Sequence, residues 1–249
     1  MHDQDEKIRK AAQLFLKSKR ATAFTGAGIS VESGIPPFRG KNGLWTKFDP
    51  ICLDLGFFLG KPEESWPLIK HIFYDSFANA RPNKAHFGLA LLERKGVIQG
   101  VITQNIDNLH QEAGNRNVIE FHGNSKYLKC TGCQNRYNIK DVHITNTPPS
   151  CPKCKKLLKP DFIFFGEGIP QDAYYASLDA AEHSDLFLLV GTSGEVVPAS
   201  QIPFLAKQNG AKIVEINVTP SAYTDQITDI FINGQAGEVM EKLVQVIFA

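Results

Sequence analysis

The chain has 249 residues, and its 27 Lys and Arg against 26 Asp and Glu give a formal net charge of +1. Hydrophobic residues make up 43% of the sequence and charged residues 21%, which is typical of a folded globular protein and excludes a disordered chain. No apolar run reaches the roughly 18 residues of a membrane span, and the first residues lack the apolar segment of a secretory signal. We therefore expect a cytoplasmic protein without a membrane partner, and a net charge near zero gives no support for a nucleic-acid partner.

The first predicted element is an amphipathic helix over residues 5–19, which carries its apolar side chains on one stripe. Short apolar runs without clean alternation, as expected for parallel strands covered on both faces, occur at 21–25, 97–103, 185–190 and 212–217. Helical patterns separate or follow them at 82–94, 172–183, 199–209 and 237–247. This alternation predicts an α/β fold with a Rossmann-like, doubly wound parallel sheet.

Two segments interrupt this alternation. Residues 46–80 are expected to form short helices and loops around several aromatic side chains, and residues 126–159 are rich in turn residues and cysteine. We interpret the first as a helical module and the second as a zinc ribbon, which together form a smaller domain. Residues 1–45, 81–125 and 160–249 then make up a discontinuous Rossmann-like domain.

Four of the five cysteines indicate a metal site. Cys130 and Cys133 form one C-x2-C pair, and Cys151 and Cys154 form a second pair after a spacer of 17 residues. Two close thiolate pairs supply the four sulfur ligands of a closed, structural zinc site. The alternative is a pair of disulfides, which the reducing cytosol disfavours. Cys52 is expected to be a small buried apolar residue.

A glycine loop follows the first predicted strand. Gly26 and Gly28 stand where a dinucleotide pyrophosphate rests on backbone N–H groups at the start of a helix. The usual third glycine is replaced by Val31, and Asp49, at the offset of the usual acidic residue, lies in a loop. The loop alone therefore leaves an ordinary tight turn and a dinucleotide site equally open.

Polar residues at the ends of other predicted strands strengthen the binding interpretation, because ligands bind at the carboxyl edge of an open α/β sheet. These residues are Gln104, Asn105 and Asp107, then Gly191, Thr192 and Ser193, and finally Asn217. His122 is a candidate general base because imidazole titrates near neutral pH. His86, His110 and His143 are interpreted as structural histidines.

The ordered motifs Gly26–Gly40 (GAGISVESGIPPFRG), Thr103–His110 (TQNIDNLH), Phe121–Gly123, the four cysteines, Phe165–Glu167 and Gly191–Ser193 make the chain resemble the sirtuin family of NAD-dependent protein deacylases. The resemblance extends from about residue 5 to the end of the chain. It implies a Rossmann-like fold, NAD as a co-substrate, one structural Zn²⁺ and an acyl-lysine protein or peptide substrate.

The resemblance also implies roles for single residues. It implies NAD contacts at Gly26, Ala27, Gly28, Ile29, Phe38, Arg39, Trp45, Gln104, Asn105, Ile106, Asp107, Gly191, Thr192, Ser193, Asn217 and Ala236. It implies that His122 is the general base, that Asn105 takes part in catalysis, and that the peptide cleft is lined by Gly166, Glu167, Glu195 and Val196. In the implied reaction the acyl oxygen attacks the ribose as nicotinamide leaves, and O-acyl-ADP-ribose and lysine are released.

Desuccinylating members of this family carry a Tyr-x-x-Arg pair in the acyl pocket. The corresponding positions here are Tyr74 and Phe77, without an arginine in the segment 66–77. We therefore expect a neutral acyl group, either acetyl or a longer aliphatic chain. Competing functions are a mono-ADP-ribosyltransferase on the same scaffold, a zinc-ribbon nucleic-acid module and a dehydrogenase.

The small net charge conceals an uneven distribution. Residues 126–159 contain eight Lys and Arg against one acidic residue, a formal charge of +7, so the remaining residues carry −6. Four thiolates on Zn²⁺ reduce the ribbon to near +5. The simpler interpretation is a solubilising surface. The alternative is a weak contact of the basic ribbon with acidic protein or nucleic acid.

Overall fold

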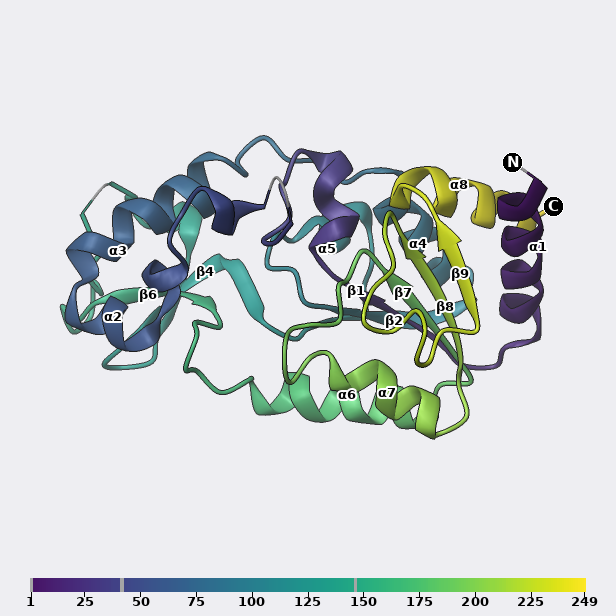
Figure 1. Ribbon diagram of the computed structural model, residues 1–249. Coiled ribbons are helices and arrows are strands. Elements are labelled where there is room, and N and C mark those ends of the chain that lie inside the picture. The colour runs from purple at the N-terminus through teal and green to yellow at the C-terminus, as the bar shows by residue number, and fades with distance from the viewer. Residues whose placement is uncertain (1, 41–42, 146) are drawn as a thin grey trace.

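The computed structural model describes residues 2–40, 43–145 and 147–249. A six-stranded sheet in the order β3-β2-β1-β7-β8-β9 forms one end of the molecule, and a three-stranded sheet in the order β5-β4-β6 lies toward the other (Figure 1). All pairs in the larger sheet are parallel, and all pairs in the smaller one are antiparallel. Numbered within its own sheet, the larger one has the Rossmann order 3-2-1-4-5-6, with the switch point between β1 and β7. The predicted fold class is confirmed.

The strands at the centre of the large sheet are the predicted ones. They are β1 (Ala21–Thr25), β2 (Ile98–Thr103), β7 (Leu186–Val190) and β8 (Lys212–Asn217). Every residue of β1 and β7 is buried, as expected for parallel strands covered on both faces. The edge strands β3 (Val118–Glu120) and β9 (Ile230–Asn233) were not predicted; they are short and mostly half-buried.

Helices cover both faces of this sheet (Figure 1). One face carries α1 (His2–Lys17), α4 (Lys84–Arg94) and α8 (Ala236–Ile247), whose apolar stripes share a core with the strands. The other face carries α6 (Gln171–His183) and α7 (Gln201–Gln208) over a second core. The short helix α5 (Leu109–Ala113), which follows β2, was not predicted. Within the described residues, no helix is both long enough and apolar enough to cross a bilayer.

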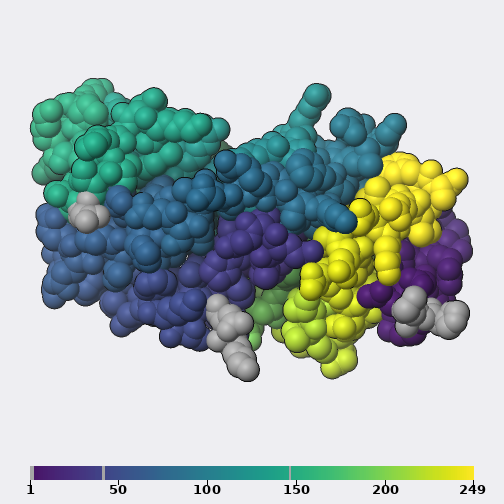
Figure 2. Space-filling view, turned by 90° about the horizontal axis from the view of Figure 1, so that it is seen from above, coloured from purple at the N-terminus to yellow at the C-terminus, as the bar shows by residue number. Residues whose placement is uncertain are grey.

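The two interrupting segments lie against each other at one end of the molecule, as the blue and green surfaces of Figure 2 show. The elements of this end are α2 (Leu55–Gly60), α3 (Pro62–Ile69), a π-helical continuation (Lys70–Asp75), β4 (Gly123–Cys130), β5 (Arg136–Asn138) and β6 (Leu158–Phe162). Trp66 and Phe73 from the helices pack in the same core as Leu128 and Leu158 from the strands. The antiparallel sheet extends three residues beyond each end of the predicted ribbon 126–159.

Candidate active site and zinc centre

A cavity of about 910 Å³ lies at the carboxyl ends of the parallel strands and reaches the aromatic core of the small domain. Its position at the switch point between β1 and β7 is where open α/β sheets bind ligands. The predicted residues that line it are Gly26, Ala27, Gly28, Phe38, Arg39, Trp45, Gln104, Asn105, Ile106, His122, Gly166, Glu167, Gly191, Thr192, Ser193, Val196, Asn217 and Ala236. Ile29, Asp107 and Glu195 are not part of the lining.

The glycine loop after β1 is pressed against the loop after β7. Gly28 N–H donates to the carbonyl oxygen of Gly191 over 2.8 Å, and a Cβ at Gly28 would lie 2.6 Å from Cα of Gly191. A side chain at this position would therefore force the two loops apart. The chain continues from Gly26 into a 3₁₀ helix (Ala27–Ser33), and Val31 borders the cavity where the usual fingerprint has its third glycine. Backbone without side chains at the mouth of the cavity fits a pyrophosphate.

Asp49, at the sequence offset of the acidic residue in the usual dinucleotide fingerprint, does not line this cavity. Asp49 is exposed and accepts a hydrogen bond from the N–H of Ile51, so it caps a short 3₁₀ helix (Pro50–Leu53) outside the cavity lining. At the end of β8 the cavity is instead lined by Asn217, whose side-chain amide donates to the carbonyl oxygen of Thr192 over 3.0 Å. A neutral amide therefore stands at this strand end.

Asn105, directly after β2, is held by both hydrogens of its side-chain amide. Nδ2 donates to the carbonyl oxygen of Gly26 over 3.1 Å and to Oγ of Ser30 over 3.2 Å. The side-chain oxygen is the remaining polar atom of the amide, and the residue borders the cavity. Asn105 therefore presents an acceptor to a ligand in a fixed orientation.

Asp107 lies behind this wall of the cavity. Its carboxylate accepts hydrogen bonds from Oγ of Ser30 over 2.7 Å and from the N–H of Leu109 over 3.0 Å. Burial raises the pKa of this carboxyl, although both hydrogen bonds act in the opposite direction. Asp107 does not line the cavity, and it is connected to the lining residue Asn105 through the hydroxyl of Ser30.

His122, between β3 and β4, has a defined tautomer. Nδ1 lies 3.0 Å from the carbonyl oxygen of Gln104, and because a carbonyl only accepts, Nδ1 carries the hydrogen. Nε2 is then an unprotonated nitrogen in the neutral ring, which borders the cavity. Burial lowers the pKa of His122, so the ring is neutral over more of the pH range. This arrangement suits a general base.

The segment around Phe38 and Arg39, for which the resemblance implies NAD contacts and which is called the cofactor loop below, packs on the core that the helical module and the ribbon share. The Phe38 ring contacts Trp45 at a centroid distance of 5.4 Å and Phe73 at 6.3 Å. Nε of Arg39 lies 3.8 Å from the Glu195 carboxylate, and both side chains are largely exposed. Glu195 therefore lies at the rim and is not part of the cavity wall.

The Glu167 carboxylate is occupied by an ion pair and a hydrogen bond within the protein. Oε2 lies 2.9 Å from Nζ of the buried Lys159, and it accepts the N–H of Phe164 over 2.7 Å. Lys159 also donates to the carbonyl oxygen of Phe162 and lies over the Phe164 ring. The ion pair and these hydrogen bonds tie the Phe164–Glu167 segment, which borders the cavity, to β6.

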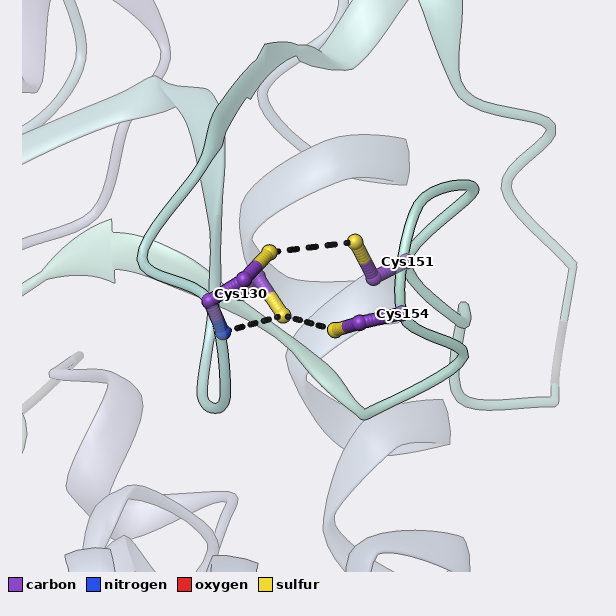
Figure 3. A group of neighbouring side chains, drawn as sticks. Cys130, Cys151 and Cys154 are labelled. Carbon is purple, nitrogen blue, oxygen red and sulfur yellow. Dashed lines mark hydrogen bonds between the residues drawn. The ribbon is translucent and has the colours of Figure 1, made fainter.

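Four cysteine sulfurs come together at the edge of the antiparallel sheet (Figure 3). The sulfurs of Cys130 and Cys154 are 3.3 Å apart, those of Cys133 and Cys151 are 3.7 Å apart, and all four lie within 4.8 Å of one another. A tetrahedral zinc with Zn–S bonds of about 2.3 Å requires sulfur separations of roughly 3.8 Å. The cluster fits a structural Zn²⁺, and all four cysteines are free of disulfides.

Part of the cavity wall was not predicted. Its apolar side consists of Leu53, Phe73, Phe162, Ile163 and Phe164, and further lining comes from Val197, Pro198, Thr219, Pro220 and Gln235. Residues 46–80 were expected to form short helices and loops around aromatic side chains, but no sequence pattern separates the aromatic side chains of a core from those of a cavity wall. His86 and His110 are fully buried, as expected for structural histidines, whereas His143 is exposed.

The sheet order, the glycine loop after β1 and the cluster of four cysteines together define a class of dinucleotide-binding enzymes that carry a second, smaller sheet with a site fitting structural zinc. Residues 26–198 match the model of the Sir2 family. An NAD-dependent protein deacylase of Pyrococcus furiosus is 46% identical over 244 residues, which cover 96% of this chain and 97% of that protein. The chain belongs to the Sir2 family, as its motifs predicted.

Two solved structures show the same fold. A complex of a Sir2 homologue with ADP-ribose has a TM-score of 0.92 and 41% identity, with 96% of both chains covered. A Sir2 complex with a deacetylated peptide and 3′-O-acetyl ADP-ribose has a TM-score of 0.90 and 36% identity, with 96% of this chain and 97% of that one covered.

Proposed function

We propose that this protein removes neutral acyl groups from lysine side chains. The coarser activity follows from its family: the chain is an NAD-dependent protein deacylase, with NAD as co-substrate. The observation that carries the proposal is the cavity itself. It is lined by the glycine loop after β1, by the His122 ring with its unprotonated Nε2, and by an apolar wall without Lys or Arg.

The roles of the chain's own residues follow from their geometry. Bound NAD supplies an electrophilic ribose carbon and nicotinamide as a leaving group. Gly26 and Gly28 let the loop after β1 pack directly on Gly191 and Thr192, and their backbone borders the cavity where the pyrophosphate would lie. Asn105 holds a fixed acceptor toward the cavity. His122 takes a proton from a hydroxyl at Nε2, while Gln104 holds the protonated Nδ1. The apolar wall excludes water, which would otherwise hydrolyse the co-substrate.

The preference for a neutral acyl group rests on the cations of the cavity. Among the described lining residues, Arg39 is the only Lys or Arg, and it lies at the rim beside Glu195. Phe73, Phe162 and Phe164 line the side toward the small domain, whereas Tyr74 is directed into the core. A succinyl carboxylate on this side would lose its hydration without gaining an ionic partner.

A peptide substrate is proposed to add as an extended segment along Gly166, Glu167 and Val196. Main-chain pairing needs little side-chain recognition, and the Glu167 carboxylate is already engaged by Lys159. A related Sir2 structure contains a deacetylated peptide, which supports this substrate class.

The test is mass spectrometry of products formed from NAD with acetyl-, butyryl- and succinyl-lysine peptides. We expect O-acyl-ADP-ribose, free lysine peptide, and kcat/KM for acetyl at least about tenfold above succinyl, the scale of one desolvated charge. Substituting His122→Ala lowers kcat/KM by about 10²–10⁴, whereas His183→Ala, on the exposed surface of α6, leaves it unchanged. A clear preference for succinyl contradicts the proposal, and transfer of ADP-ribose to protein without deacylation would indicate the transferase instead.

The partner of the basic ribbon stays a prediction. Lys126, Lys129, Lys140, Lys153, Lys155 and Lys156 are exposed and have no ion-pair partner among the described residues. We propose weak, salt-dependent binding of acidic peptide or nucleic acid here, and binding that does not respond to salt would contradict it.

We also propose that the protein works in the cytoplasm, a reducing compartment that keeps the four thiols available to zinc.

A further inference from the structure

A chain of buried hydrogen bonds leads from the cavity wall into the protein. The backbone N–H of Asn105 donates to Oγ1 of Thr103 over 3.0 Å, and the hydroxyls of Thr103 and Thr25 are hydrogen-bonded at 2.9 Å. Oγ1 of Thr25 lies 2.9 Å from Nε2 of His110. Thr25 and Thr103 are register partners at the carboxyl ends of β1 and β2, so the sheet itself brings the two hydroxyls together.

His110 is the buried end of this chain. Its side chain is 1% exposed, and burial lowers its pKa to about 4. Neither Nδ1 of His110 nor Oδ1 of the neighbouring Asn115 has a hydrogen-bond partner among the described residues. The Asn115 side chain raises the pKa of His110, against the larger lowering effect of burial. Nδ2 of Asn115 donates to Glu93 over 2.6 Å, which ties this corner to α4. Burying an imidazole here costs desolvation free energy that an aliphatic side chain would not cost. Among the described residues, the one short side-chain hydrogen bond of His110 is to Thr25.

The side chain of Asn105 is anchored in the same region. Its Nδ2 donates to Oγ of Ser30, which lies 3.5 Å from Nε2 of His86. The His86 ring in turn packs on the His110 ring, with centroids 4.9 Å apart. The backbone and the side chain of Asn105 are therefore held by two hydrogen-bonded paths that converge on one buried histidine pair.

We propose that His110 is a positioning residue for the deacylation reaction, which acts through Thr25 and Thr103 to fix the backbone of Asn105 in the cavity wall. The inference rests on the proposed role of Asn105. The Thr25 hydroxyl donates to Thr103, whose oxygen also accepts the Asn105 N–H, and Nε2 of His110 can donate to Thr25. His110 therefore closes a continuous path. Without it, the two hydroxyls are free to rotate and the Asn105 N–H loses a directed acceptor.

The sharpest test removes one hydroxyl without changing the shape of the side chain. Thr25→Val interrupts the path, and Thr25→Ser keeps it. Thr22→Val is the matched control. Thr22 is buried on the same strand, and its hydroxyl accepts a hydrogen bond from Ser184, just before β7 and at the amino-terminal ends of the strands, away from the cavity. Melting temperatures show whether each variant is folded.

For Thr25→Val we expect kcat/KM for NAD to fall roughly 10- to 100-fold, because misplaced positioning groups cost up to about this factor. The inhibition constant of nicotinamide is expected to rise in parallel, with the KM for the acyl peptide within about twofold of wild type, since the path serves only the wall around Asn105. His110→Leu gives the same pattern, and His110→Gln, whose amide can still bond to Thr25, recovers most of the loss.

A readout without catalysis follows the bond itself. Amide hydrogen exchange at Asn105, measured by NMR in the free protein, accelerates in Thr25→Val and His110→Leu but not in Thr22→Val. The inference is overturned if wild type deacylates while Thr25→Val and His110→Leu leave NAD kinetics and Asn105 exchange unchanged. It is also overturned if Thr22→Val lowers them equally. A wild type without deacylase activity would instead overturn the proposed function.

Discussion

The buried histidine pair makes the stability of this protein depend on pH in a way that one substitution isolates. Burial lowers the pKa of His110 to about 4 and, with a smaller effect of His110, that of His86 to about 3, against 6.5 for an unperturbed histidine. In the unfolded chain both rings take up protons near pH 6.5, whereas in the folded protein they stay neutral. Their contribution to stability is therefore present above pH 6.5 and lost as the pH falls below it.

The magnitude follows from the two pKa values. Between the folded and unfolded values, each histidine costs about 1.4 kcal/mol of unfolding free energy per pH unit. From pH 7.5 to pH 5.0 the loss amounts to about 2 kcal/mol for His110 alone. His110→Gln removes this titration and leaves every other ionisable group in place.

The assay is urea unfolding of wild type and His110→Gln at several pH values between 7.5 and 5.0. We expect the difference in unfolding free energy to shift by about 2 kcal/mol in favour of the variant at pH 5.0. Thr22→Val, which removes no titratable group, serves as the control with a constant difference. A constant difference for His110→Gln would show that this ring titrates equally in both states, and would refute the reasoning.

Three further predictions concern the zinc centre, the base and the peptide edge. Cys154→Ser is expected to lower bound zinc well below one ion per chain and to reduce the melting temperature, because the site holds the ribbon together; Cys52→Ser, a buried thiol outside the cluster, retains the metal. The acidic limb of kcat/KM is expected below pH 6.5, because burial lowers the pKa of His122 and the neutral ring is the active form; a midpoint above pH 7 would contradict this. Lys159→Met leaves the Glu167 carboxylate without its cation, which is expected to cost about 2 kcal/mol of unfolding free energy. It is also expected to raise the KM for peptide more than the KM for NAD. Lys129→Met, an exposed control on the neighbouring strand, changes neither the stability nor the KM values.

The central strands were predictable because burial on both faces leaves an apolar run that turn residues interrupt. The edge strands were not, since Val118–Glu120 has three half-buried residues and Ile230–Asn233 has one fully buried residue. A helix was expected after Gly26, and the structure has a 3₁₀ helix there, with its first turn close against Gly191.

The site was predictable where function restricts residue type, as at the four cysteines and the strand-end polar groups. It was not predictable where only the folded geometry decides. The sequence did not show that the Asp107 carboxylate bonds to Ser30 outside the cavity lining, and its contact with NAD stays a prediction. The sequence also did not show that Glu195 lies at the rim beside Arg39, and its contact with peptide stays a prediction. The positioning role proposed for Thr25 and His110 was not predictable from the sequence, because it depends on the register of two parallel strands.

The core that the helical module and the zinc ribbon share has a spectroscopic consequence. The chain has two tryptophans; Trp66 is buried in this core and donates to the carbonyl oxygen of Thr145, and Trp45 packs against it while bordering the cavity. Intrinsic tryptophan emission therefore reports the small domain and the cofactor loop, whereas far-ultraviolet circular dichroism is dominated by the helices around the parallel sheet. A chelator titration followed by both signals separates the melting of one end of the molecule from that of the other, with no label added.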